Sequence, residues 1–488
     1  MGVKDDLVKI VGKKNVLDSP DILEVYAGEA NCQPRIRPKL VVKPANAQEV
    51  QQVVKWANEM RTPLVAVSSG APHTREDTIP GMGGAVIVDL TRMKKIMRID
   101  PNNRVAWVEP GVTFTELQPE LEKAGFSAHL PLCPRSNKSV LASMLEREPI
   151  TMPAHHWDCL DPFLCGEIIF GTGDILRSGE AAGPDPIEEQ WKKGKAHMSP
   201  FGLGQFDESR LVTGAQGTIG IITWASLKIR PLSTTNKTFL VPSDNLEPLI
   251  DASYTMLRRR FGDHSFILND LNLACLLAQD RMEINALREA LPKWILVTSL
   301  EGYGLLPEEK VAYQEADFKE ILARSSGLKP ETSVLWATGD DLSQILSRPS
   351  AEPYWKIRHK GAFRDLFFLT TLDETPRFAE KISSLAVSQR FSPSDIGVYI
   401  QPIVQGTSCH CEFDFYYDPD NEGGAGRAKW LATEGAAELS KRGAFFSRPY
   451  GPWAKIAYAG AAETAIVQRK VKNIFDPQNV LNPGKLCF

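Results

Sequence analysis

A strand–helix–strand pattern near the N-terminus leads directly into a polar loop, and few folds satisfy this order. Residues 39–42 are a short apolar segment, and apolar residues then recur at helical spacing from 50 to 57. Residues 63–67 form a second apolar segment, typical of a buried strand. The loop 68–74, Ser-Ser-Gly-Ala-Pro-His-Thr, follows at once. We expect two strands joined by a helix, with small polar residues at the carboxyl end of the second strand.

The next 150 residues mix strands, turns and helices without regular alternation. Pro110-Gly111 turns the chain, and Thr113 with Glu116 is the pattern of a capping box for a helix. Gly171-Thr172-Gly173 separates two short strands, which predicts a hairpin. Strands are expected at residues 85–90, 104–109, 167–170, 174–177 and 221–230. This order predicts the α+β fold class.

The pattern changes after Pro231, and we place a domain boundary near residue 233. Helical stretches now separate longer strands, and a Pro- and Asn-rich tail follows the last helix. The expected helices are 251–260, 310–323, 428–441 and 463–474, and the expected strands are 294–300, 397–404 and 409–417. The tail is best explained as a return to the first domain. The predicted domains are therefore 1–232 with 443–488, and 233–442.

Composition excludes several classes of function. A net charge of -4 offers no basic stripe for nucleic acid, and no run of 18 apolar residues is present to span a bilayer. The N-terminal segment lacks the basic and apolar regions of a signal peptide, so a cytoplasmic protein is expected. The eight cysteines are dispersed without a Cys-x-x-Cys pair, and no metal site is expected.

Common nucleotide and hydrolase motifs are missing. No Gly-x-Gly-x-x-Gly follows a strand, and no Gly-x-x-x-x-Gly-Lys-Ser/Thr occurs. A bound nucleotide must therefore be held in another way. The absence of Gly-x-Ser-x-Gly and His-Glu-x-x-His lowers the expectation of a hydrolase or a zinc protease.

Four segments resemble the vanillyl-alcohol oxidase and para-cresol methylhydroxylase superfamily of FAD-linked oxidases and dehydrogenases. They are residues 63–74, 108–113 (Val-Glu-Pro-Gly-Val-Thr), 211–223 (Leu-Val-Thr-Gly-Ala-Gln-Gly-Thr-Ile-Gly-Ile-Ile-Thr) and 475–485 (Phe-Asp-Pro-Gln-Asn-Val-Leu-Asn-Pro-Gly-Lys). Their order and spacing carry the resemblance, which covers roughly residues 38 to 232 and the last forty or so. It implies an FAD-binding PCMH-type domain of two subdomains and a cap (substrate) domain on an antiparallel sheet. The substrate pocket would face the flavin ring.

The resemblance also implies which residues bind FAD. Small residues let backbone N–H groups approach a pyrophosphate closely, which suits the loop and the glycines of the third segment. The expected cofactor-binding residues are Ser68, Ser69, Gly70, Ala71, Pro72, His73, Thr74, Ser143, Arg147, Gly214, Gly217, Thr218, Gly220, Ile222, Asn482 and Lys485.

The binding segments depart from the family pattern at three places, the first being the loop 68–74, which is less glycine-rich than in the relatives. Residues 141–144 and 215–217 replace the glycine-rich elements of the relatives, which leaves open a noncatalytic subunit of a redox complex. Several relatives link FAD through a histidine in the loop, so His73 is either a covalent attachment point or, as we prefer, a noncovalent neighbour. At most one of His155 and His156 is expected to face the flavin.

Catalytic residues are expected in the cap and just after it. Residues 409–417 alternate, so His410 and Glu412 share one face of a strand, and Tyr399 and Gln401 share a face of the adjacent strand. We expect His410 to be the base and Glu412 its orienter; the alternative is a histidine of the cap surface or core. Arg448, with Tyr450 close by, stands where relatives carry a substrate-facing Arg or Tyr. An interdomain salt bridge is the alternative.

The resemblance implies an oxidoreductase that passes a hydride from substrate to flavin. A para-substituted phenol or aryl alcohol is the preferred substrate, and a 2-hydroxy acid such as glycolate or D-lactate is the alternative. No heme-attachment or iron–sulfur motif is present, so electrons are expected to pass to oxygen, a cytochrome or an electron-transfer flavoprotein. A homodimer or a hetero-oligomer is possible.

Overall fold

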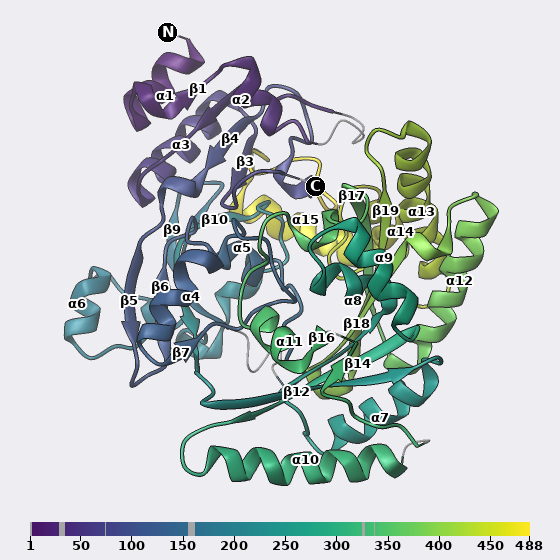
Figure 1. Cartoon of the computed structure of the whole chain (residues 1–488). Helices are drawn as coiled ribbons and strands as arrows, with labels where there is room; N and C mark the ends of the chain where they lie inside the picture. Colours follow the sequence, from purple (N-terminus) through teal and green to yellow (C-terminus); the bar gives the residue numbers. More distant parts are fainter. Residues whose placement is uncertain (1, 29–34, 74, 155–161, 325–326, 336) are drawn as a thin grey trace.

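The computed structural model describes residues 2–28, 35–73, 75–154, 162–324, 327–335 and 337–488. Helices pack on sheets of four, five and six strands (Figure 1). The smaller two lie on one side of the molecule and the largest on the other. This mixed arrangement confirms the α+β class.

The four-stranded sheet contains the predicted strand–helix–strand unit. Its order is β1 (Val16–Leu17), β2 (Leu40–Val42), β4 (Val86–Asp89) and β3 (Leu64–Val67). The last three strands are parallel, and α3 (Ala47–Met60) connects β2 to β3. The side chain of Asn46 caps α3 by accepting from the Glu49 amide at 2.9 Å. The Glu49 carboxylate accepts from the Ala45 amide instead of closing the capping box.

The five-stranded sheet is antiparallel, in the order β5 (Ile96–Asp100), β6 (Val105–Val108), β10 (Gly220–Lys228), β8 (Phe163–Phe170) and β9 (Ile175–Arg177). The predicted hairpin at residues 171–173 joins β8 to β9. Thr113 and Glu116 form the predicted capping box of α4 (Phe114–Lys123). This helix and α5 (Val140–Leu145) contribute to one buried core with the sheet.

The six-stranded sheet is also antiparallel, in the order β12 (Thr235–Ser243), β14 (Trp294–Gly302), β13 (His264–Asn269), β18 (Ile396–Ile403), β19 (Ser408–Tyr417) and β17 (Ala362–Thr370). A separate apolar core covers each face. The helices around it include α7 (Glu247–Arg258), α10 (Pro307–Arg324), α12 (Thr375–Ser388) and α13 (Glu422–Ser440) for one core, and α8 (Asp270–Leu277), α9 (Arg281–Ala290) and α11 (Gly339–Leu346) for the other. Every long strand expected after Pro231 belongs to this sheet.

The C-terminal segment returns to the first sheet, as predicted. After α14 (Pro452–Ala459), which the sequence analysis missed, α15 (Ala462–Phe475) leads to the tail. Leu64 of β3 donates its amide to Val480 O at 2.7 Å, and the Asn482 amide donates to Leu64 O at 2.8 Å. The yellow end of the chain in Figure 1 thus packs against the N-terminal region.

The remaining short elements complete the chain: α1 (Val3–Val11), α2 (Pro20–Val25), β7 (Phe126–Ser127), α6 (Ile187–Lys192), β11 (Arg230–Pro231), β15 (Ser333–Val334) and β16 (Ala337–Thr338). None of the helices in the described ranges has the length and apolar character to cross a bilayer.

Candidate functional site

Two adjoining cavities lie between the part of the chain before residue 233 and the six-stranded sheet, next to the C-terminal segment that follows α13. The larger has a volume of about 580 Å³ and the smaller about 110 Å³. Glu146, Arg448 and Tyr450 line both cavities. An elongated ligand can therefore extend from one cavity into the other.

The smaller cavity is lined largely by backbone and apolar side chains. Five of the predicted cofactor residues line it: Ser68, Gly214, Gly217, Gly220 and Ile222. Gly214 and Gly217 have φ of 73° and 67°, and a Cβ at Gly214 would meet no atom within 4 Å. The turn therefore presents bare backbone to the cavity, as a flat or charged cofactor requires. These residues fit FAD.

Asn482 supports this turn from the C-terminal tail. Its Nδ2 donates to Gln216 O at 2.8 Å and to Asp77 O at 2.7 Å. Asn482 does not line either cavity, so its place is behind the cofactor turn. Lys485, also predicted to bind FAD, does not line either cavity.

The loop after β3 is fixed by a second loop. The Ser139 amide donates to Ser69 Oγ, and the Gly70 amide donates to Asn137 O, both at 3.0 Å. A Cβ at Gly70 would lie 3.0 Å from Asn137 Nδ2, so glycine allows this close approach. Ala71 and Pro72 line the larger cavity. Thr74, His155 and His156 lie outside the described residues.

His73 lies at the wall of the larger cavity, stacked on Tyr26 with ring centroids 4.7 Å apart. It is only 5% exposed, and burial lowers its pKa to about 4 against the opposing effect of Asp89. The imidazole is therefore neutral at physiological pH. This position is compatible with either a covalent or a noncovalent flavin contact.

Three other predicted cofactor residues make internal contacts. Thr218 is fully buried and donates to Ala215 O at 2.6 Å. Ser143 donates to Glu148 at 2.7 Å, and Arg147 donates to Thr213 Oγ1 at 3.1 Å. None of the three lines a cavity, so the structure places them behind the site. Short polar side chains in a family motif do not reveal by themselves which way they point.

The larger cavity combines aromatic walls with charged groups. Six aromatic side chains line it: Tyr354, Trp355, Phe363, Tyr399, Tyr450 and Trp453. Such walls favour a planar, apolar ligand, because aromatic surfaces gain most by packing against rings.

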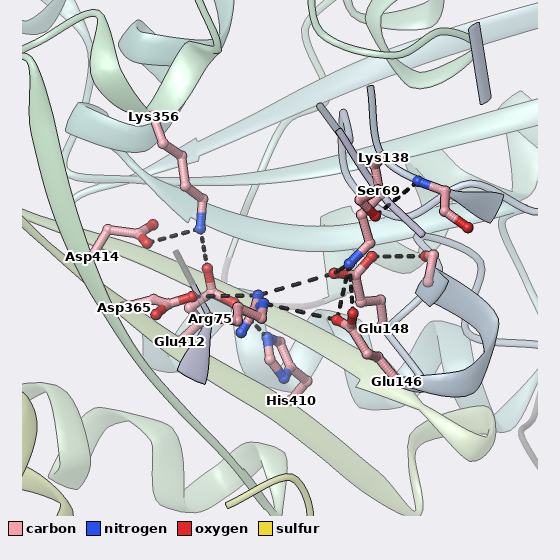
Figure 2. A network of polar contacts seen from close by, with 12 residues as sticks. Ser69, Arg75, Lys138, Glu146, Glu148, Lys356, Asp365, His410, Glu412 and Asp414 are labelled. Atoms are coloured by element: carbon pink, nitrogen blue, oxygen red, sulfur yellow. Dashed lines mark hydrogen bonds and ion pairs between the residues drawn. The ribbon is translucent and has the colours of Figure 1, made fainter. Parts of the chain in front are cut away.

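A buried ion network crosses the junction of the cavities (Figure 2). Lys138 Nζ lies 2.9 Å from Glu146 and 3.1 Å from Glu148. Arg75 lies between Asp365 at 3.4 Å on β17 and the same two glutamates at 3.8 and 4.0 Å. Burial raises the pKa of Glu148, but Lys138 and Arg75 outweigh it and lower the value to about 2. Arg75 thereby links the part of the chain before residue 233 to the six-stranded sheet.

A second ion cluster stands on β19. Lys356 contacts Glu412 and lies 2.8 Å from Asp414 Oδ1 (Figure 2). His410 Nε2 lies 2.9 Å from Glu412 Oε2. Burial, together with the charge of Glu412, raises the pKa of Asp414 to about 7, although Lys356 opposes this. Burial also lowers the pKa of His410, despite the hydrogen bond to Glu412.

The predicted strand face is present, but the order of its residues differs from the prediction. Gln401 lies opposite His410 and Tyr399 opposite Glu412 in the paired strands. Tyr399 and Glu412 line the larger cavity, whereas His410, only 1% exposed, and Gln401 do not. His410 therefore lies behind Glu412, because the strand carries it deeper into the core than alternation alone could show.

Arg448 is a buried cation that forms no ion pair within 4.0 Å among the described residues, and Glu148 interacts with it only at longer range. Its guanidinium lies 4.4 Å from the centroid of the Phe367 ring, and the residue is 6% exposed. In the described ranges no carboxylate pairs with it, so the salt-bridge alternative finds no support there. Tyr450 lines the same two cavities, and the substrate-facing role of the pair stays a prediction.

Charged residues of the site that the sequence analysis missed include Arg75, Lys138, Glu146, Glu148, Lys356, Asp365 and Asp77. Arg75 directly follows the predicted loop, which was a usable signal. Lys356 belongs to no motif, and only the fold brings it to β19. Groups of His, Cys, Asp and Glu that could hold a metal ion do not occur in the part of the chain that the structure describes.

Comparisons with known proteins agree with the geometry. Residues 38–144 match the model of the FAD binding domain family. The chain is 24% identical to an uncharacterized FAD-linked oxidoreductase of Mycobacterium tuberculosis, over 98% of this chain and 97% of that protein. It is 28% identical to glycolate oxidase subunit GlcD of Bacillus subtilis, but over only 50% of this chain and 48% of that protein.

The fold matches the solved structure of p-cresol methylhydroxylase with substrate bound. The TM-score is 0.83 at 19% identity, and the match covers 99% of this chain and 96% of the other. The chain is an FAD-dependent oxidoreductase that contains a match to the FAD binding domain family and has the fold of p-cresol methylhydroxylase.

Proposed function

We propose that this enzyme oxidises a para-substituted phenol or aryl alcohol, with Arg448 holding the phenolate oxygen. The single observation that carries the proposal is this buried guanidinium, which has no close ion pair among the described residues, at the junction of the two cavities. A buried cation without a partner is costly, and an anionic ligand oxygen removes that cost through charge-assisted hydrogen bonds. Tyr450 lines the same junction and supplies a further hydroxyl.

The alternative substrate, a 2-hydroxy acid, requires a proton acceptor at its hydroxyl group. Both substrates must lose an O–H proton: a 2-hydroxy acid loses it from the hydroxyl on the carbon that gives up the hydride and needs a base there, whereas a phenol loses it at the ring oxygen, where Arg448 stabilises the phenolate. Glu412 is the carboxylate of the cap cluster that lines the cavity, and although burial opposes this, Lys356 holds its pKa well below the usual range. Glu412 is therefore a weak base, which favours the phenol.

A 2-hydroxy acid remains the second candidate because of two observations. Arg448 suits a carboxylate as well as a phenolate. The partial match to a glycolate oxidase subunit points to the same class.

The two regions divide the work in this proposal. Residues 1–232 and 443–488 hold FAD, through the bare backbone of 214–217 and the wall at Ser68 and His73, and residues 233–442 form the cap. When bound, FAD accepts a hydride from the substrate. The aromatic walls exclude water and align the ring. Electrons leave to a separate acceptor, such as oxygen, a cytochrome or an electron-transfer flavoprotein; a cytoplasmic location and an oligomeric state stay predictions.

An anaerobic titration tests the proposal. The FAD-loaded protein is mixed with 4-hydroxybenzyl alcohol, 4-methylphenol, glycolate or D-lactate, and the flavin band at about 450 nm is followed. We expect bleaching by at least one phenol and none by the hydroxy acids. Bleaching by a hydroxy acid alone would transfer the assignment to the second candidate.

A further inference from the structure

Lys356 presents an unused hydrogen-bond donor on the aromatic wall of the larger cavity. It belongs to a short turn, residues 355–357, and its Nζ lies 5.1 Å from the centroid of the Trp355 ring and 5.3 Å from that of Phe363. An ammonium has three N–H donors. Within the described ranges its acceptors are Glu412 and Asp414, which leaves one N–H for a ligand.

Glu412 presents acceptors at the same wall. Its Oε1 accepts from Lys356, and its Oε2 is paired with His410 Nε2. Each carboxylate oxygen has two lone pairs, so each can accept a further hydrogen bond. Because both oxygens are pinned by neighbours, the carboxylate keeps one orientation. Donor and acceptor thus stand side by side, facing the cavity.

The charge of this cluster determines which ligand group fits. Two carboxylates, Glu412 and Asp414, adjoin the one ammonium of Lys356. Glu412 already faces this wall as a carboxylate, so a ligand carboxylate placed beside it would be repelled. A methyl group would leave the donor and the acceptor unsatisfied. A neutral hydroxyl accepts from Lys356 and donates to Glu412, and so satisfies both.

We propose that Lys356 is a specificity-determining residue that, with Glu412, binds a neutral hydroxyl on the side chain of the phenolic substrate. The inference rests on the proposed function, in which Arg448 binds the phenolate. It divides the phenols into two groups: a 4-hydroxyaryl alcohol engages both ends of the cavity, and a 4-alkylphenol engages only Arg448. The enzyme then acts as an aryl-alcohol oxidising enzyme rather than an alkylphenol hydroxylating one.

The test compares 4-hydroxybenzyl alcohol with 4-methylphenol in anaerobic flavin reduction by stopped flow. The proteins are wild type, Lys356→Met, Lys356→Arg and the double variant Lys356→Met/Asp414→Asn, which removes the ammonium together with one of its two acidic partners. Lys360→Met is the matched control, because Lys360 is four residues away, pairs with Asp395 at 2.5 Å and lines no cavity.

We expect the preference of the wild type for the alcohol over 4-methylphenol to fall about 10-fold or more in Lys356→Met or in the double variant, because a hydrogen-bonded substrate hydroxyl loses its charged donor. Reduction by 4-methylphenol should stay within about 3-fold, and Lys356→Arg should restore part of the preference. An unchanged preference in the double variant overturns the role of Lys356. If the wild type is reduced only by hydroxy acids, the proposed function itself falls, and the inference with it.

Discussion

The two cavities are built in opposite ways. Away from the junction residues that both cavities share and from Asp77, the smaller is lined mainly by small and apolar residues from segments that are recognisable in the sequence, such as Gly214 and Gly217 in one turn. The larger is lined by charged and aromatic side chains from separate elements, such as Arg75, Lys356 and Arg448. A cofactor shared by a superfamily can be held by a local backbone shape, whereas a substrate is selected by side chains that only the whole fold brings together.

The largest expected effect comes from the junction of the cavities. Arg448→Ala should lower the rate of flavin reduction by a phenol about 100- to 1,000-fold, because it removes the charged donor at the developing negative charge. FAD binding should fall much less than the reduction rate, since the backbone turn at 214–217 is retained, although Arg448 also lines the smaller cavity. Stopped-flow reduction and FAD titration measure the two quantities. Arg442→Ala, at an exposed position close in sequence, is the control, and an unchanged reduction rate would remove Arg448 from the site.

The contrast between the two cavities also explains which parts of the fold and of the site could be predicted from the sequence. The strand–helix–strand unit, the hairpin at 171–173 and the alternation of 409–417 follow from local periodicity and turn chemistry, and the structure confirms them. The placement of His410 behind Glu412 does not follow, because alternation gives the face of a residue but not its depth. The place of Lys356 in the site could not be predicted from the sequence, since its partner Asp414 is far away in the chain.

A smaller effect is expected in the turn that faces the cofactor. Gly217→Ala adds a methyl group to the wall of the smaller cavity at φ 67°, and FAD affinity should fall about 10- to 100-fold, the cost of overpacking a close contact. Isothermal titration of the apoprotein with FAD measures this. Gly304→Ala, at φ 68° with no atom within 4 Å, introduces similar backbone strain outside both cavities. Equal losses in the two variants would point to strain alone.

Asp77, at the wall of the smaller cavity, makes the stability of the apoprotein depend on pH. Burial and then Glu146 raise its pKa to about 6, although Lys138, Arg75 and Lys485 oppose the shift. A raised carboxyl pKa means that folding is penalised as pH rises from the unfolded value, 3.8, through 6. Asp77→Asn should therefore stabilise the apoprotein by about 1–3 kcal/mol at pH 7.5 and by almost nothing near pH 3. Denaturant unfolding at both pH values checks this, and an equal gain at both would refute the charge explanation.

The smallest effect is expected at His410, which touches the larger cavity only through Glu412. His410→Gln should slow flavin reduction about 3- to 10-fold, the effect of one altered hydrogen bond. If His410 were itself the base, the loss would be about 100- to 10,000-fold. The pH profile of reduction separates the two roles, because loss of a base also abolishes a limb of the profile.

The most direct test of the proposed binding of FAD and a phenolic substrate is a crystal structure of the protein with reduced FAD and 4-hydroxybenzyl alcohol. We predict that the pyrophosphate and ring of FAD follow the bare backbone at Gly214 and Gly217, that the phenol oxygen lies within hydrogen-bond distance of Arg448, and that the alcohol hydroxyl meets Lys356 and Glu412. A substrate ring bound away from Arg448, or a carboxylate ligand held there in preference to the phenol, would contradict the account.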